Sequence, residues 1–180
     1  PTDEQTGFKT TATQLTQFLT PRTKALVINS PSNPTGAVYD RATLEAIAEL
    51  AIRHNLLIIS DEIYEHFLYD GRTHCSIASL GPKIKAQTVV INGVSKTFAM
   101  TGWRIGYAAG PKSLISAMGI IQSQSTSNPS SIAQKAAIGA LREGRSFYVP
   151  MAEEFTERRT LMHAQVTSIP GMRCLKPEGA

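Results

Sequence analysis

The sequence predicts an α/β fold in which a mostly parallel sheet carries helices on both faces. Short apolar runs rich in β-branched residues alternate along the chain with longer segments of helical periodicity. The apolar runs have no polar face, which is typical of strands buried in a parallel sheet. Of the 180 residues, 42% are hydrophobic and 18% are charged, so the chain is long and apolar enough to bury a real core.

The first elements follow in order from this pattern. Residues 25–29 predict a buried strand, and the two prolines and one glycine of residues 30–36 predict a loop after it. Residues 41–54 predict a helix with its apolar side chains on one face, and Asp40 is suited to cap its N-terminus. Residues 56–60 predict the second strand.

The next elements repeat the arrangement of a buried strand followed by polar residues. Residues 61–67 predict a short helical turn directly after the second strand, residues 88–92 a third strand, and residues 105–109 a fourth. Ligands of open α/β sheets bind just beyond the carboxyl ends of the strands. The polar residues at these ends are therefore the candidates for a site.

Three helices are predicted after the sheet, over residues 112–122, 129–142 and 148–165. Asn128 is placed to cap the second of them, with Pro129 at its first helical position.

The chain is predicted to divide into two parts. Residues 1–145 form part of a large domain, and residues 146–180 hold a connecting helix and the start of a second, smaller α+β domain. Residues 172–175 are expected to open a strand of that second domain. We interpret the chain as a fragment, since no natural terminus is recognisable at either end.

Composition argues against several classes of function. The 18 Lys and Arg residues behind the net charge of +4 are scattered, which is not the pattern of a nucleic-acid partner. The sequence has neither an apolar run that would cross a membrane nor a recognisable signal peptide, so we expect a cytoplasmic protein without a membrane partner. Cys75 and Cys174 have no metal-ligand spacing, and we expect both to be reduced, with no metal site.

The loops after the strands carry a set of chemically distinct side chains, namely Asn33, Asp61, Tyr64, Ser95, Lys96 and Arg104. A lysine amine is a good nucleophile towards an aldehyde when burial or nearby cations keep it deprotonated. A carboxylate buried at a strand end needs a cationic partner, and a protonated pyridine nitrogen would serve. The planar guanidinium of Arg104 is suited to a phosphate dianion.

Each residue also has an ordinary explanation. Lys96 would be a solvated surface charge, Asp61 a helix cap or the partner of Arg104, Tyr64 a core phenol, and Asn33 a turn former before proline. Other polar groups are given structural roles only: Glu62 and Glu65 as structural or surface charges, and the histidines at 54, 66 and 74 as solvent-facing or capping groups.

Three stretches together resemble the class I and II aminotransferases of the large pyridoxal phosphate (PLP) fold-type I group. They read NSPSNPTG over residues 29–36, SDEIY over residues 60–64 and GVSKTFAMTGWRIGY over residues 93–107. Their order and spacing also match, and the resemblance extends over nearly the whole chain. The residues of these motifs are most similar to those of bacterial aspartate aminotransferases, including the enzymes that accept prephenate or aromatic acids.

The resemblance implies a cofactor, PLP, and roles for two residues in its chemistry. Lys96 would hold PLP as a Schiff base and then move a proton between the substrate's α-carbon and the cofactor. Asp61 would pair with the pyridine nitrogen and keep it protonated.

The other site residues would fix the cofactor in place. Tyr64 and Asn33 would hydrogen-bond its phenolic oxygen, and Arg104 would bind its phosphate. Ser95 is a possible contact only, because many relatives have the phosphate-binding serine where this chain has Gly93. The resemblance also implies a cis peptide near Pro34.

The activity implied is transfer of an amino group from an amino acid, with aspartate the first expectation and aromatic or prephenate-type substrates possible, to a 2-oxo acid such as 2-oxoglutarate. The intact protein is expected to be a homodimer with shared active sites, and these 180 residues alone are expected to be inactive. Two alternatives stay open: a PLP-dependent β-lyase of the same fold, and a non-catalytic aminotransferase-like domain of a transcription regulator.

Overall fold

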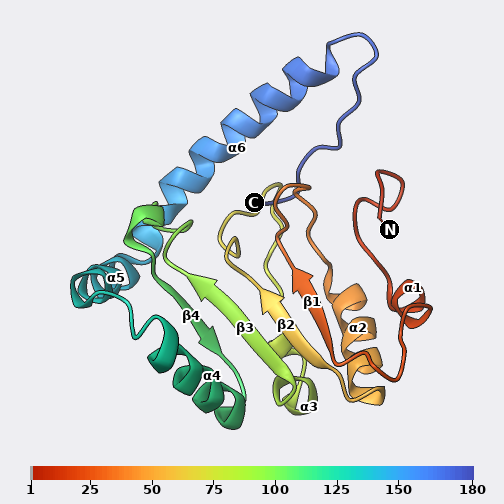
Figure 1. The fold of residues 1–180 in the computed structure, drawn as a ribbon. Coiled ribbons are helices and arrows are strands. Elements are labelled where there is room, and N and C mark those ends of the chain that lie inside the picture. The colour runs from red at the N-terminus through yellow and green to blue at the C-terminus, as the bar shows by residue number, and fades with distance from the viewer. Residues whose placement is uncertain (1) are drawn as a thin grey trace.

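The computed structural model describes residues 2–180, which fold around a four-stranded sheet (Figure 1). The strands lie side by side in chain order: β1 (Ala25–Asn29), β2 (Leu57–Asp61), β3 (Thr88–Gly93) and β4 (Gly106–Ala109). β1 pairs with β2 and β2 with β3 in parallel, whereas β4 runs antiparallel to β3. The predicted class, a mostly parallel α/β sheet, is confirmed.

Six α-helices accompany the sheet in the described residues: α1 (Ala12–Thr16), α2 (Arg41–Arg53), α3 (Pro82–Lys85), α4 (Lys112–Ser125), α5 (Ser131–Glu143) and α6 (Arg145–Thr167). Two short 3-10 segments, Ile77–Ser79 and Thr101–Trp103, complete the regular structure. Figure 1 shows α2 and α3 against one face of the sheet and α6 extending away from it. None of the helices described within residues 2–180 combines the length and apolarity needed to cross a membrane.

The first hydrophobic core lies between α2 and strands β1 and β2. Ile47 of α2 and Ile58 of β2 are completely buried there, and Leu44 is 2% exposed. The helix forms as predicted because its apolar residues share one face and Asp40 caps it, its carboxylate accepting a hydrogen bond from Thr43 N at 2.8 Å. This core fixes the two strands whose carboxyl ends carry candidate site residues.

A second core holds the segment that follows β3. Val94 is completely buried and Phe98 is 7% exposed, and both belong to one cluster with Ala133 and Ala137 of α5. Small alanines on α5 allow its backbone to approach this segment closely. The loop that contains Lys96 therefore rests on a packed helix rather than on solvent.

The loop after β1 is packed against the end of the described chain. Gly36 has a φ of +69°, and a Cβ there would lie 2.5 Å from Pro177 Cβ, so only glycine fits. Its carbonyl accepts hydrogen bonds from the backbone N–H groups of Glu178 at 2.8 Å and Gly179 at 3.0 Å. The peptides Ser30–Pro31 and Asn33–Pro34 in this loop are cis, as the resemblance implied for the region of Pro34.

Two local predictions about helices are wrong. Residues 61–67 form successive turns rather than a helical turn, with hydrogen bonds from Glu65 N to Glu62 O and from Phe67 N to Tyr64 O. Asn128 does not cap α5, which begins at Ser131. Its amide instead donates to the carbonyl of Pro129 at 3.0 Å.

The predicted strand at residues 172–175 is also absent from the structure. These residues are exposed and have no neighbouring strand to pair with, and the nearest pairing is an isolated bridge between Leu68 and Gly179. α6 begins at Arg145, before the predicted 148, because Tyr148 packs against Phe98 and stacks on His66, which stabilises an extra turn ahead of Pro150.

We predict that Ile47→Ala destabilises the protein by about 2–5 kcal/mol, because it leaves a cavity in a fully buried position. Denaturant unfolding measures this change. Glu49→Ala, on the exposed face of the same helix, is the matched control and is expected to stay within about 0.5 kcal/mol of wild type. Equal losses from the two variants would contradict the assignment of this core.

Candidate active site

The parallel strands bring their carboxyl ends to one edge of the sheet. In the strand register Asn29 lies opposite Asp61, and Asp61 lies opposite Ile91, so β1, β2 and β3 end almost level. The loops that follow them carry Asn33, Tyr64 and Lys96, and they leave the sheet side by side (Figure 1). Sequence positions that are far apart thus meet because of the parallel pairing.

Three of the predicted site residues line one cavity of about 420 Å³: Tyr64, Ser95 and Lys96. Lys96 Nζ lies 5.6 Å from the centroid of the Tyr64 ring. Asn33 joins them from the first loop, since its Nδ2 donates a hydrogen bond to the Tyr64 hydroxyl at 3.2 Å. The structure therefore brings together an amine, a phenol, an amide and a hydroxyl.

The backbone around Lys96 is held by its own hydrogen bonds. Phe98 N donates to Val94 O at 3.1 Å, Ala99 N to Lys96 O at 3.2 Å, and Met100 N to Ser95 O at 3.0 Å. Among residues 2–180, no hydrogen bond or ion pair occupies the Lys96 amine. The site thus presents a half-buried lysine on a fixed backbone with its nitrogen free to react.

Asp61 is the last residue of β2, and its side chain lies on the sheet face opposite α2. Its Oδ1 accepts a hydrogen bond from Ile63 N at 3.1 Å. Within the described part of the chain it forms no salt bridge, so the alternative in which it pairs with Arg104 is not found. One carboxylate oxygen of Asp61 has no protein hydrogen-bond donor among these residues.

Arg104 lies outside the walls of the cavity. It has a left-handed backbone with φ 56°, its side chain is exposed, and its Nη1 donates to the carbonyl of Thr101 at 2.8 Å. Thr101 does line the cavity, so Arg104 contacts a residue of the cavity wall without being part of that wall. Of the six predicted residues, three do not line the cavity: Asn33, which contacts it through the Tyr64 hydroxyl, Asp61 and Arg104.

Part of the cavity wall was not predicted from the sequence. Phe67, Met151 and Phe155 line it, and the rings of Phe67 and Phe155 meet edge to face with centroids 5.5 Å apart. Met151 and Phe155 belong to α6. The apolar residues of this helix are not gathered on one face, so its sequence does not indicate a binding surface. Ala180 closes the cavity from the end of the described chain.

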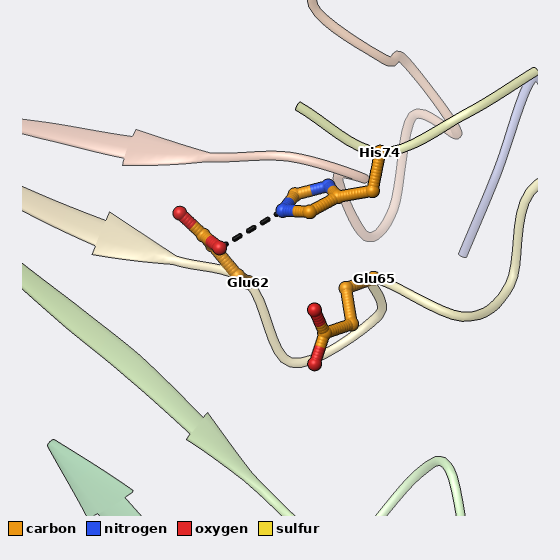
Figure 2. A group of neighbouring side chains, drawn as sticks. All are labelled: Glu62, Glu65 and His74. Atoms are coloured by element: carbon orange, nitrogen blue, oxygen red, sulfur yellow. Dashed lines mark hydrogen bonds and ion pairs between the residues drawn. The ribbon is translucent and has the colours of Figure 1, made fainter. Parts of the chain in front are cut away.

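Beneath the Tyr64 turn lies a layer of buried polar side chains on the α2 side of the sheet. Glu62, only 4% exposed, accepts hydrogen bonds from Ser60 Oγ at 2.9 Å and Ser76 Oγ at 2.7 Å. His74 Nε2 lies 2.9 Å from the other carboxylate oxygen of Glu62 (Figure 2). His74 was predicted to be solvent-facing or capping, and this is wrong, because its side chain is only 14% exposed and contacts Glu62.

This polar layer has the side chains of a metal site, but its two carboxylates are already hydrogen-bonded, and among the described residues His74 Nδ1 is its buried atom without a partner. Ligand atoms of Glu62, Glu65 and His74 lie within 4.8 Å of one another. The carboxylate of Glu62 already accepts three hydrogen bonds, however, and Glu65 accepts one from Asn92 Nδ2 at 2.5 Å. We therefore assign the cluster a structural role.

The structure thus places a lysine amine, without a hydrogen-bond partner in the described residues, beside a phenol at the carboxyl end of a parallel sheet. Comparisons with known proteins identify the family. A family model described as "Aminotransferase class I and II" matches residues 1–180, and the chain belongs to this family.

Individual relatives are named as aminotransferases. An aspartate aminotransferase of Geobacillus stearothermophilus is 54% identical over 177 residues, which cover 98% of this chain and 45% of the relative. An aspartate/prephenate aminotransferase of Cereibacter sphaeroides is 51% identical over 98% of this chain and 44% of its own length. The crystal structure of an aspartate aminotransferase from Rhizobium meliloti superposes with a TM-score of 0.96 at 46% identity, over 99% of this chain and 45% of that one. The chain thus spans less than half the length of these relatives.

The Glu62 carboxylate gives a prediction about pH. Burial raises the pKa of Glu62, but the hydrogen bonds from His74, Ser76 and Ser60 outweigh it and hold this pKa below the ordinary value of 4.5. A lowered pKa stabilises the folded state above pH 4.5, and this contribution is lost as the pH falls through the folded-state pKa.

Glu62→Gln removes the titrating group. We expect it to cost about 1.5–3 kcal/mol at pH 7, and we expect the gap from wild type to narrow as the pH falls below 4.5. Denaturant unfolding of both proteins between pH 7 and pH 3 measures the gap. A gap that stays constant with pH would show that the Glu62 charge does not contribute to stability.

Proposed function

We propose that the protein is a PLP-dependent transaminase, which moves the amino group of an amino acid to a 2-oxo acid such as 2-oxoglutarate. Aspartate is the proposed donor, with prephenate-type and aromatic substrates as the extension that the named relatives suggest. The observation that carries the proposal is the free amine of Lys96 facing the Tyr64 ring in a cavity at the carboxyl end of the sheet.

The residues present fit PLP by their chemistry. The cavity offers an amine without a competing partner among residues 2–180 and a phenol already paired with an amide. Asp61 keeps one carboxylate oxygen without a protein donor in that range, as a partner for a pyridinium N–H requires. Bound PLP would supply an aldehyde for amines to condense with and a ring that accepts electrons from the substrate's α-carbon.

Each residue has a proposed role. Lys96 Nζ binds the cofactor and then moves the proton of the substrate's α-carbon. Asp61 holds the pyridine nitrogen protonated, and the Tyr64 hydroxyl and Asn33 amide bind the phenolic oxygen. Ser95 and Arg104 are proposed for the phosphate. Arg104 would reach it by giving up its contact with the Thr101 carbonyl.

The domain organisation, the oligomeric state and the partners are proposed from membership of the family. Residues 1–145 are proposed as part of a large cofactor-binding domain, and residues 146–180 as the connection to a smaller one. The intact protein is proposed to be a homodimer with amino acid and 2-oxo acid substrates and no nucleic-acid or membrane partner. A cytoplasmic location is part of the same proposal.

The proposal is tested by the absorbance of the intact protein mixed with PLP. We expect wild type to develop a visible band that borohydride fixes covalently to Lys96, as peptide mass spectrometry would show. Lys96→Ala is expected to lose both the band and the covalent label. Lys83→Ala, an exposed lysine on α3, is the control and should keep both. A label that persists in Lys96→Ala would refute the assignment.

Tyr64→Phe tests the proposed role of the Tyr64 hydroxyl in binding PLP. It removes one hydrogen bond to the cofactor and the partner of Asn33, so the Kd for PLP is expected to rise about tenfold. Equilibrium dialysis with PLP measures this constant. Tyr148→Phe, whose ring lies outside the cavity walls, is the control and is expected to bind PLP as wild type does. Equal Kd values for wild type and Tyr64→Phe would remove Tyr64 from the site.

A further inference from the structure

Tyr64 and Lys96 reach the cavity from two different loops, so their separation depends on whatever joins those loops. Within residues 2–180, one side-chain hydrogen bond links the Tyr64 turn to the strand that leads to Lys96. Asn92 Nδ2 donates to Glu65 Oε1 at 2.5 Å. Glu65 is the residue after Tyr64, and Asn92 lies on β3 shortly before Lys96.

The Asn92 end of this bond is connected rigidly to Lys96. Asn92 is 6% exposed, and its Oδ1 accepts a hydrogen bond from Gly93 N at 2.7 Å. Gly93 is so tightly enclosed that a Cβ there would lie 2.8 Å from the carbonyl oxygen of Ile105. Val94, the next residue, is completely buried. A displacement of Asn92 therefore carries the Lys96 segment with it.

The Glu65 end is equally fixed. Its backbone N–H donates to Glu62 O at 2.9 Å, and the Glu62 side chain is anchored by Ser60, Ser76 and His74. The polar layer thus holds the Tyr64 turn from below. Figure 2 shows the Glu65 side chain on the same turn as Glu62, and a carboxylate oxygen of Glu65 lies within 4.8 Å of ligand atoms of Glu62 and His74. Two links from this turn to β3 are found in residues 2–180: the backbone hydrogen bond from Glu62 N to Ile91 O at 2.9 Å, and the side-chain bond between Glu65 and Asn92, which alone can be altered by substitution.

We infer that Glu65 and Asn92 are positioning residues, whose hydrogen bond sets the separation between the Tyr64 phenol and the Lys96 amine. Neither side chain lines the cavity. Both act through the residues beside them. The inference deepens the proposed function and rests on it for its catalytic meaning, while the bond itself can be tested without cofactor.

The test exchanges donor and acceptor. Asn92→Asp replaces the donating amide by a second carboxylate and so repels Glu65. Combining it with Glu65→Gln restores the bond in the opposite direction, because the new amide donates to the new carboxylate with the same number of side-chain atoms. The Oδ1 contact with Gly93 N is kept in both variants. Gln87→Ala, which removes side-chain hydrogen bonds to Asn55 and to the carbonyl of Leu56 at the opposite end of β3, is the control.

Two measurements are made on the intact protein. Without PLP, the rate at which acetic anhydride modifies Lys96, relative to the exposed Lys83, is read by mass spectrometry. With PLP, the pH dependence of the visible band and the kcat of transamination are recorded. We expect Asn92→Asp to raise the relative Lys96 rate several-fold, shift the spectral titration and lower kcat by about 10- to 100-fold. The double variant should return all three quantities towards the wild-type values, and Gln87→Ala should leave all three at the wild-type values.

The outcomes separate this inference from the proposed function. A Lys96-dependent band in wild type that Asn92→Asp leaves unchanged, with unchanged Lys96 acetylation, overturns the inference and leaves the function standing. Failure of the double variant to restore the rates also overturns it. If PLP gives no band in any protein, the proposed function fails, and the acetylation rates of the three variants alone decide whether the bond positions Lys96.

Discussion

The parallel pairing of β1, β2 and β3 is the constraint on which the rest of the structure depends. Because the three strands end almost level, the loops that follow them meet at one edge, and the loops after β2 and β3 form the cavity together with α6 and Ala180. The core between α2 and the sheet holds that register, since slipping a strand by one residue would turn Ile58 outwards and Asp61 inwards. Fold stability and site geometry thus depend on the same apolar contacts.

The two faces of the sheet edge perform different tasks. On one side Asp61 is left with unused hydrogen-bonding capacity, while on the other Glu62 is fully engaged with Ser60, Ser76 and His74. Strand alternation sends these neighbouring carboxylates in opposite directions. Of these two adjacent acidic residues, Asp61 is therefore available to bind a ligand, whereas Glu62 stabilises the structure.

Much of this arrangement could be predicted from the sequence. The strands, α2 with its Asp40 cap, and the meeting of Asn33, Tyr64 and Lys96 follow from local periodicity and from motifs at strand ends. The failures have a common cause, which is tertiary contact. His74 was predicted to face solvent because its partner Glu62 lies twelve residues away, and no local pattern indicates that the two side chains meet.

Helix ends and cavity walls were less accessible for the same reason. The start of α6 is set by aromatic packing of Tyr148, not by local propensity, and the contribution of Phe155 to the cavity depends on where α6 is directed.

The close approach of Gly36 and Pro177 has a consequence for how the sequence can evolve. Two positions remote in the sequence share one volume, so a bulkier residue at position 36 requires both another backbone conformation there and another path of the C-terminal segment, and these sites are expected to diverge together.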